Sequence, residues 1–415
     1  MLTNEEKRID IYSRTERPTF PSEVTPEVPL ASLNLNWTER DLPERIRTKH
    51  VHRLHPYLGK YIPQLVEIFL RKYFRSGQTV CDPFVGSGTT LVQACELGIN
   101  SIGYDISAFN ILLAKAKTRK YEIEKVAAEI ENILKSVKKF FSSQSGIIYP
   151  SFDENAMRQL SLFDANSSLA DVEYLQKWFA PQSLHELLAY LRAIETSEYE
   201  YADLLKIILS RSARSARLTT HFDLDFPKQP QTEPYYCYKH SRVCQPTNEA
   251  LKFLNRYSLD TIKRIKEFAR LRTDAQVDIF HENSINADIP PIDGVITSPP
   301  YVGLIDYHAQ HAYAYHLLGL QDRSKEEIGA AANGLSLKAK AQYQKDIAAV
   351  FRRVANSIKP GGRIVVVAAD RFNLYGEIAK LAELEAEDTL ERHVNRRTGR
   401  RASEFFETIF VWRKP

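Results

Sequence analysis

The sequence contains few cysteines and no long apolar run. Its 415 residues include four cysteines, and none of them belongs to a C-x-x-C pair. Cysteines so scattered do not provide a disulfide framework, so we expect reduced thiols. No apolar run approaches membrane-spanning length, and the first ten residues, MLTNEEKRID, are mostly charged or polar. These absences lead us to expect a cytoplasmic protein with no membrane partner.

The sequence also lacks a strong excess of either charge. Its net charge is +4, with 43% hydrophobic and 26% charged residues. This is the balance of an ordinary globular protein, and it excludes the disordered and fibrous classes. Such a weak net charge gives little support for a nucleic-acid partner, so only local clusters of basic residues can support one.

Strands and helices alternate along most of the chain. Apolar strands such as QTVCD, NSIGYDIS, VDIF, DGVIT and RIVVVAA are separated by stretches with helical spacing, including a continuous one over residues 108–141. This alternation predicts an α/β fold with a doubly wound, mostly parallel sheet. We expect a surface arm (1–50), a first catalytic part (51–144), an inserted domain (145–245) and a second catalytic part (246–415).

A glycine turn follows the first predicted strand, in the segment CDPFVGSGTT. Gly86 and Gly88 allow a tight turn and a close approach to a ligand, and the helix that follows offers free backbone N–H groups. The segment lacks the lysine of a Walker loop and the third glycine of the dinucleotide motif. Asp105 lies 23 positions after Asp82, a spacing typical of a carboxylate that binds ribose hydroxyls. Helix capping by either aspartate is the alternative.

A second constellation, TSPPY, ends the strand DGVIT. The two prolines remove backbone donors and fix the chain, so that the Ser298 hydroxyl and nearby carbonyls are presented as acceptors. Such a site suits an amine, with an aromatic ring beside it. The alternative is that the prolines merely end the strand and Tyr301 packs on the core.

DPFVGSGTT and TSPPY together resemble the paired signature of the S-adenosylmethionine-dependent DNA amino-methyltransferases, especially the cytosine-N4 branch. HPYLGKYIPQL, at residues 55–65, resembles the segment of that family that closes over the methionine end of the cofactor. KPGGRIVVVAADR and ETIFVWRK resemble its later core strands. The resemblance covers residues 50–140 and 275–415 and leaves the insertion unassigned.

The resemblance implies a Rossmann-like methyltransferase fold that binds S-adenosylmethionine. The implied cofactor-binding residues are Tyr57, Asp82, Phe84, Gly86, Gly88, Thr89, Asp105 and Asn283. Asn283 departs from the family, which usually has an acidic residue near the adenine. The implied catalytic residues are Ser298, Pro299, Pro300 and Tyr301.

The implied reaction is methylation of N4 of a flipped-out cytosine in double-stranded DNA, in a restriction-modification context with a cognate endonuclease as partner. Methylation at C5 would require a nucleophilic cysteine, and none of the cysteines follows a proline, as it does in the C5 family. Methylation of adenine N6, or of an RNA base, remains an alternative. The serine of TSPPY, in place of Asp or Asn, favours cytosine.

The insertion is expected to recognise the target sequence. Arg211, Arg214 and Arg217 recur at helical spacing, and a turn-like stretch from Arg392 onward includes Arg397 and Arg400. We expect these arginines to contact DNA, although ion-paired surface residues would show the same pattern.

Three possible metal ligands lie near the end of the insertion. Cys237, His240 and Cys244 are close together in the sequence, but their spacing is irregular and no fourth ligand is evident. The sequence therefore predicts no metal site.

Overall fold

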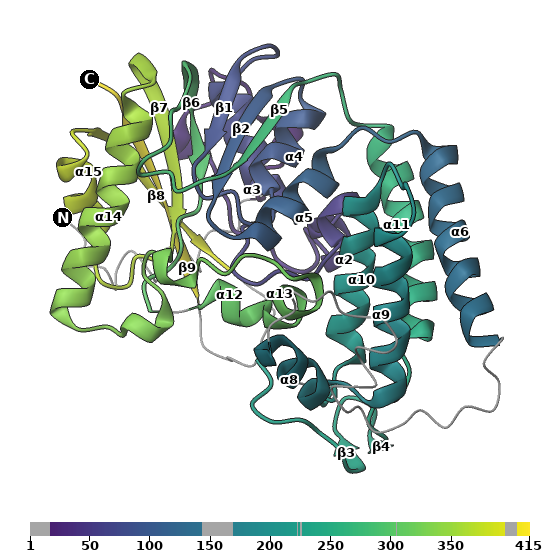
Figure 1. Ribbon diagram of the computed structural model, residues 1–415. Coiled ribbons are helices and arrows are strands. Elements are labelled where there is room, and N and C mark those ends of the chain that lie inside the picture. The colour runs from purple at the N-terminus through teal and green to yellow at the C-terminus, as the bar shows by residue number, and fades with distance from the viewer. Residues whose placement is uncertain (1–16, 143–168, 222, 225, 304, 395–404) are drawn as a thin grey trace.

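The computed structural model describes residues 17–142, 169–221, 223–224, 226–303, 305–394 and 405–415 (Figure 1). Its centre is a seven-stranded sheet with the order β5-β2-β1-β6-β7-β9-β8. The strands are β1 (Thr79–Asp82), β2 (Asn100–Asp105), β5 (Val277–His281), β6 (Ile292–Thr297), β7 (Ile358–Ala368), β8 (Glu385–His393) and β9 (Phe406–Arg413). β9 runs antiparallel to its two neighbours, and the other pairings are parallel.

Helices cover both faces of this sheet. One face packs against α3 (Pro63–Tyr73), α4 (Thr89–Glu96) and α5 (Ala108–Thr118), and the other against α14 (Leu337–Ala355) and α15 (Tyr375–Leu381). The alternation of side chains along β7 explains this arrangement: Ile364 and Val366 enter the core under α14, whereas Val365 and Val367 enter the core under α3. The predicted doubly wound, Rossmann-like methyltransferase fold is confirmed.

A helical layer lies beside the sheet (Figure 1). It consists of α6 (Ile123–Ser142), α8 (Leu169–Trp178), α9 (Pro181–Glu195), α10 (Ala202–Ala216) and α11 (Leu251–Ala269). The short helices α12 (Tyr307–Gln310) and α13 (Ala312–Leu318) connect it to the catalytic part. Apolar residues of α6, α9, α10 and α11 form one core with Phe109 of α5 and Tyr313 of α13. The expected insertion therefore shares its core with the catalytic part.

The segment before the first strand was expected to be a surface arm. In the described residues it contains the short helix α2 (Glu44–Arg47) and the 3-10 turns η1 (Pro21–Glu23), η2 (Leu30–Ser32) and η3 (His50–Arg53). Leu35, Trp37 and Leu42 are 5% exposed or less and join the core beneath α3. The segment thus closes one face of the sheet.

The remaining elements lie at the edges. A two-stranded hairpin, β3 (Tyr235–Cys237) and β4 (Arg242–Cys244), projects beyond the helical layer (Figure 1). Two 3-10 turns, η4 (Ser324–Glu326) and η5 (Ala331–Asn333), precede α14. Among the described residues, no helix is both long and apolar enough to cross a membrane.

Candidate active site

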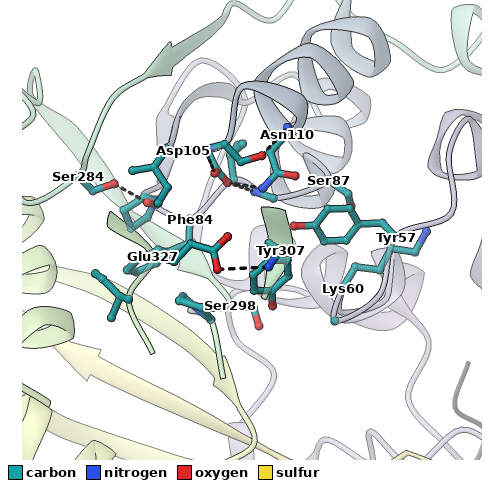
Figure 2. Close-up of a pocket in the computed structure, with 18 of the residues that line it drawn as sticks. Tyr57, Lys60, Phe84, Ser87, Asp105, Asn110, Ser284, Ser298, Tyr307 and Glu327 are labelled. Carbon is teal, nitrogen blue, oxygen red and sulfur yellow. Dashed lines mark hydrogen bonds between the residues drawn. The ribbon is translucent and has the colours of Figure 1, made fainter. Parts of the chain in front are cut away.

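The candidate site lies where the strand order reverses. β1 and β6 are parallel neighbours, and the chain continues from β1 toward β2 on one side and from β6 toward β7 on the other. A cavity that is partly open to solvent lies where these two strands end, with about 810 Å³ of empty space when its open mouth is included (Figure 2). Ligands of open α/β sheets bind in this crevice. Its lining includes Tyr57, Lys60, Phe84, Gly86, Ser87, Thr89, Asp105, Asn110, Asn283, Ser284, Ser298, Pro300, Tyr307 and Glu327.

The glycine turn after β1 forms one wall. Gly86 and Gly88 have φ of +46° and +75°, a backbone region that strains other residues. A Cβ at Gly86 would meet the Tyr57 hydroxyl at 3.2 Å, and one at Gly88 would meet Ala114 at 3.1 Å. Gly86 and Thr89 line the cavity, whereas Gly88 packs against α5 and begins α4 as its N-cap.

A buried lysine supports this turn. The Lys117 ammonium donates a 2.7 Å hydrogen bond to the Ser87 carbonyl, and burial lowers its pKa well below the usual value. Lys117 was not predicted from the sequence, because a lysine in an amphipathic helix is normally exposed to solvent. The lysine holds the glycine turn from below.

Asp105, at the end of β2, brings a carboxylate to the cavity. Its Oδ2 accepts hydrogen bonds from the Gly86 amide at 2.8 Å and from Asn110 Nδ2 at 3.1 Å. Burial raises the pKa of this carboxyl, and the hydrogen bonds that it accepts oppose the rise. The N-cap of α5 is Ser107, so Asp105 is not the cap of that helix. Its Oδ1 accepts one hydrogen bond, from the Ser107 amide at 2.8 Å, and therefore keeps a lone pair for a ligand in the cavity that Asp105 lines.

Asp82, at the end of β1, does not line the cavity. Its fully buried carboxylate accepts hydrogen bonds from Thr297 Oγ1 at 2.6 Å, the Phe84 amide at 3.2 Å and the Tyr61 hydroxyl at 3.3 Å. Burial raises the pKa of Asp82 to about 6. Asp82 therefore has a structural role outside the cavity lining, where its hydrogen bond from Thr297 joins the end of β1 to the end of β6.

The segment TSPPY follows β6 and forms the opposite wall. Ser298 and Pro300 line the cavity. The Ser298 hydroxyl is buried and forms no hydrogen bond of good geometry with the described residues, although its proximity opposes the rise that burial causes in the pKa of Tyr301. The Pro300 carbonyl accepts a 2.9 Å hydrogen bond from Tyr343, which fixes the loop.

The structure places Tyr301 and Pro299 differently from Ser298. Tyr301 is 9% exposed and packs in the core beneath α14, and Pro299 is also buried. Neither side chain lines the cavity. The open aromatic face that we expected from Tyr301 is therefore turned toward the core in this structure.

The cofactor side of the cavity is closed by aromatic and polar side chains. The rings of Tyr57 and Tyr307 stack with their centroids 5.9 Å apart. Glu327 accepts hydrogen bonds from the Tyr307 amide at 3.3 Å and from the His308 amide at 2.8 Å, and these contacts hold α12 against the site. Figure 2 shows Glu327 beside Tyr307. Tyr307 and Glu327 were not predicted from the sequence, because neither belongs to a glycine turn or a strand end.

Asn283 and Phe84 lie on the remaining side. Asn283 lines the cavity, and its side-chain oxygen accepts a 3.1 Å hydrogen bond from the Ile285 amide. The next residue, Ser284, donates to the Pro83 carbonyl at 2.5 Å and thereby ties the end of β5 to the glycine turn. An amide in this position can both donate and accept at the edge of a purine.

Comparisons with known proteins agree with this geometry. Residues 36–116 match a family model described as DNA methylase. The Type II methyltransferase M.MjaII of Methanocaldococcus jannaschii is 38% identical over 430 residues, which cover 89% of this chain and 81% of that protein. The chain belongs to the DNA amino-methyltransferase family. It is therefore a DNA methyltransferase, and DNA is its substrate.

More distant relatives of the methyltransferase are similar over shorter spans. M.BsoBI of Geobacillus stearothermophilus is 23% identical, over 72% of this chain and 58% of that protein. M.MvaI of Kocuria varians is 24% identical, over 60% of this chain and 53% of that protein. Among solved structures, the rRNA methyltransferase aviRa of Streptomyces viridochromogenes aligns over 87% of this chain and 89% of its own, with 12% identity and a TM-score of 0.33. The fold assignment rests on the strand order of this chain.

S-adenosylmethionine is the cofactor of the methyltransferase, and the cavity has the groups that it requires. Asp105 offers oxygen acceptors for ribose hydroxyls, and Asn283 offers an amide for adenine. Tyr57 and the backbone of the glycine turn line the region between the strand ends. These residues would hold the nucleoside and methionine portions of the cofactor beside Ser298.

The arginines expected at DNA occupy different environments. Arg211 pairs with Asp260 at 2.7 Å, and its guanidinium lies 4.2 Å from the Tyr257 ring. Arg217 is 3% exposed and lies 4.4 Å from the Tyr313 ring. Internal contacts thus engage both Arg211 and Arg217, and Arg214 is partly exposed.

The second basic cluster is described only at its start. The turn that we expected from Arg392 onward is wrong for Arg392 itself, which belongs to β8, is 4% exposed and pairs with Glu407 at 2.8 Å. Arg397 and Arg400 lie outside the described residues.

Proposed function

We propose that the enzyme transfers a methyl group to N4 of a flipped-out cytosine in double-stranded DNA. The observation that supports this most strongly is the Ser298 hydroxyl, a buried acceptor at the cavity wall with no well-formed hydrogen bond among the described residues. A buried polar atom without a partner is costly, so a ligand amine that donates to it relieves that cost. The serine of TSPPY also favours the cytosine branch over adenine.

The chemistry requires that the amine become nucleophilic. Bound S-adenosylmethionine supplies an electrophilic methyl group on a sulfonium. The exocyclic amine is a poor nucleophile because its lone pair is delocalised into the ring, and hydrogen bonds to Ser298 Oγ and the Pro299 carbonyl would localise that pair. The same acceptors stabilise the positive charge that develops on nitrogen during transfer. The methylated amine then releases one proton to solvent, and no covalent enzyme intermediate is needed.

The base has to leave the duplex before it can reach the cavity. Tyr301 was expected to place an aromatic ring beside the target amine, but its ring is largely buried. In the closed geometry described here, Tyr301 supports the loop that carries Ser298. Stacking by this ring would require the loop to open when DNA binds.

Target recognition is proposed for residues 145–245, and phosphate binding for Arg214, Arg397 and Arg400. Arg211 and Arg217 stabilise the helical layer through their internal contacts. A cognate restriction endonuclease is also proposed, because the three relatives carry Type II names. Digestion of methylated plasmid with a panel of endonucleases would reveal protection at one recognition sequence, and cleavage throughout would contradict this proposal.

Product analysis tests the proposed function. Duplex DNA is methylated by the purified enzyme, digested to nucleosides and analysed by mass spectrometry, with transfer RNA as a parallel substrate. We expect N4-methylcytosine from DNA and no product from RNA. N6-methyladenine as the sole product would replace the cytosine assignment, and 5-methylcytosine would contradict direct transfer to an amine.

A further inference from the structure

The β3–β4 hairpin is too small to be stable through its own packing. Each strand has three residues, and Tyr236, Tyr238 and Val243 expose 54%, 78% and 62% of their surface. Isolated two-stranded hairpins are marginal in water, so an ordered one requires another source of stability. The hairpin nevertheless buries two side chains completely or nearly so, Cys237 at 0% and Cys244 at 8% exposure.

These two cysteines meet two histidines. His240 lies in the turn between β3 and β4, and His221 comes from the loop that follows α10, 16 residues before Cys237. One potential ligand atom from each of the four residues lies within 4.8 Å of all the others. Cys237 Sγ is 3.5 Å from His221 Nδ1 and 3.7 Å from His240 Nδ1, and Cys244 Sγ is 3.5 Å from His240 Nδ1.

These separations match the edges of a tetrahedral zinc site. Zinc binds thiolate sulfur at about 2.3 Å and imidazole nitrogen at about 2.0–2.1 Å, so adjacent sulfur and nitrogen ligands lie about 3.5 Å apart. The Tyr235 hydroxyl also lies 2.8 Å from His221 Nδ1, a contact that an ion bound to this nitrogen would replace. Hydrogen bonds of this kind explain single pairs of atoms, but not the convergence of two cysteines and two histidines on one point. The strand register pairs Cys244 with Tyr235, so the two cysteines are not directly opposite each other.

We propose that His221, Cys237, His240 and Cys244 bind one Zn²⁺ ion that orders the β3–β4 hairpin. Two thiolates neutralise the charge of the ion, and binding releases their two protons to solvent. All four positions are taken by the protein, which is the arrangement of a structural rather than a catalytic zinc. The sequence did not predict this site, because His221 is distant in the chain and only the fold makes it the fourth ligand.

The location of the proposed ion indicates that it stabilises the attachment of the hairpin to the helical layer. The hairpin projects from the end of the helical layer beyond α8 (Figure 1). The ion links the loop after α10 to both strands, so it fastens the hairpin to the layer. Free energy of zinc binding becomes folding free energy in such small elements.

Metal analysis of the full-length enzyme, purified under reducing conditions without chelator, tests this proposal. We expect one zinc per chain, and replacement by Co²⁺ should give the visible ligand-field bands of a tetrahedral site together with thiolate charge-transfer absorption. Cys244→Ala should lose the metal, whereas Cys95→Ala, which removes a buried cysteine outside the cluster, should keep it. Wild-type protein without stoichiometric metal after incubation with zinc and dialysis, or a metal-loaded Cys244→Ala variant, would overturn the site.

A second measurement uses only the wild-type enzyme, so its outcome does not depend on whether a variant folds. Chelation of the wild-type enzyme should make Cys237 and Cys244 reactive to a thiol reagent, and added zinc should protect them again. Cys81 and Cys95 are buried in the catalytic part and should stay unreactive in both states. Equal labelling of Cys237 and Cys244 with and without zinc, or a Cys237–Cys244 disulfide in the reduced preparation, would contradict the proposal.

Discussion

The Thr297 hydroxyl donates a 2.6 Å hydrogen bond to the Asp82 carboxylate. The bond joins the ends of two strands whose residues are 215 positions apart in the chain, one leading into the glycine turn and the other into TSPPY. A second bond, from Thr90 Oγ1 to the Ile296 carbonyl at 3.1 Å, reinforces the same junction. The cofactor loop and the catalytic loop are therefore fixed to each other beneath the cavity.

The buried carboxylate of Asp82 should make stability depend on pH. Its folded-state pKa is raised to about 6, from an ordinary value of 3.8. A raised pKa means that the folded state favours the protonated carboxyl. The contribution of Asp82 to the free energy of unfolding is therefore complete below pH 3.8 and is lost as pH rises through 6. The loss amounts to about 3 kcal/mol. Denaturant unfolding from pH 4 to 8 should show a weaker decline for Asp82→Asn than for wild type, and parallel curves would contradict this origin.

Asp105 should be required for cofactor affinity. Asp105→Ala removes an acceptor that we assign to the ribose hydroxyls, and hydrogen bonds to charged groups contribute about 1.5–3 kcal/mol each, so affinity should fall at least about tenfold. Isothermal calorimetry with S-adenosylmethionine measures this. Asp278→Ala is the matched control, because Asp278 is an exposed aspartate on the neighbouring strand β5. Unchanged affinity in a folded Asp105→Ala variant would refute the assignment.

Alanine variants at Gly88 and Gly77 allow the cost of backbone strain to be separated from the cost of crowded packing. Both have positive φ, +75° and +86°, so an alanine at either costs about 1–2 kcal/mol. A Cβ at Gly88 also meets Ala114 at 3.1 Å, whereas one at Gly77 meets nothing within 4 Å. Gly88→Ala should therefore unfold at lower denaturant concentration than Gly77→Ala and should bind cofactor more weakly. Equal losses in both variants would show that contact with α5 does not matter.

Ser298 should affect the rate of transfer more than cofactor binding. Ser298→Ala removes an acceptor that strengthens in the transition state, so the single-turnover rate should fall on the order of a hundredfold. Ser284→Ala is the control, because its hydroxyl lines the same cavity but bonds to the Pro83 carbonyl. That variant should keep its rate at saturating cofactor. A Ser298→Ala enzyme with normal rate and weakened cofactor binding would reverse the two roles.

Arg397 and Arg400 should contribute sequence-independent affinity for DNA. Replacement of either by alanine should weaken binding to specific and random duplexes alike, and should reduce the slope of log K against log salt by about 1. Arg217→Ala, by contrast, should lower the stability of the helical layer, because this guanidinium is buried against Tyr313. Titrations at several salt concentrations, with unchanged slopes for both Arg397→Ala and Arg400→Ala, would exclude phosphate contacts by this stretch.

The sequence predicted the sheet well because its strands are short apolar runs bounded by turns. The sequence was less informative about elements whose ends depend on contacts with residues distant in the chain. Residues 108–141 were interpreted as one helical stretch, but the helix is interrupted between α5 and α6. There the Tyr121 hydroxyl donates a hydrogen bond to the Ala116 carbonyl, and the Glu122 amide donates one to the Tyr201 hydroxyl. β8 was not predicted, because it is an edge strand whose residues are largely exposed and lack an apolar run.

The candidate site shows the same division. Gly86, Asp105 and Ser298 were found because glycine turns and strand ends have local signatures. Lys117 and Glu327 act through groups remote in the chain, and no local pattern distinguishes them from surface charges. The arginines around α10 show the converse. Arg211 and Arg214 lie on the helix as expected, but Arg217 is its C-cap with extended backbone geometry, and the contacts of Arg211 and Arg217 depend on α11 and α13.

The shared core of the helical layer and the catalytic part limits which segments of the enzyme can be exchanged with a relative. A chimera that exchanged only residues 145–245 with a relative would leave Phe109 of α5 and Tyr313 of α13 facing foreign side chains. The exchanged unit would have to carry the inner faces of α5, α6, α11 and α13 with it, because these helices form one core with α9 and α10. The recognition role that we propose for residues 145–245 would thus not transfer with that segment alone, because coordinated substitutions across the shared core would be needed.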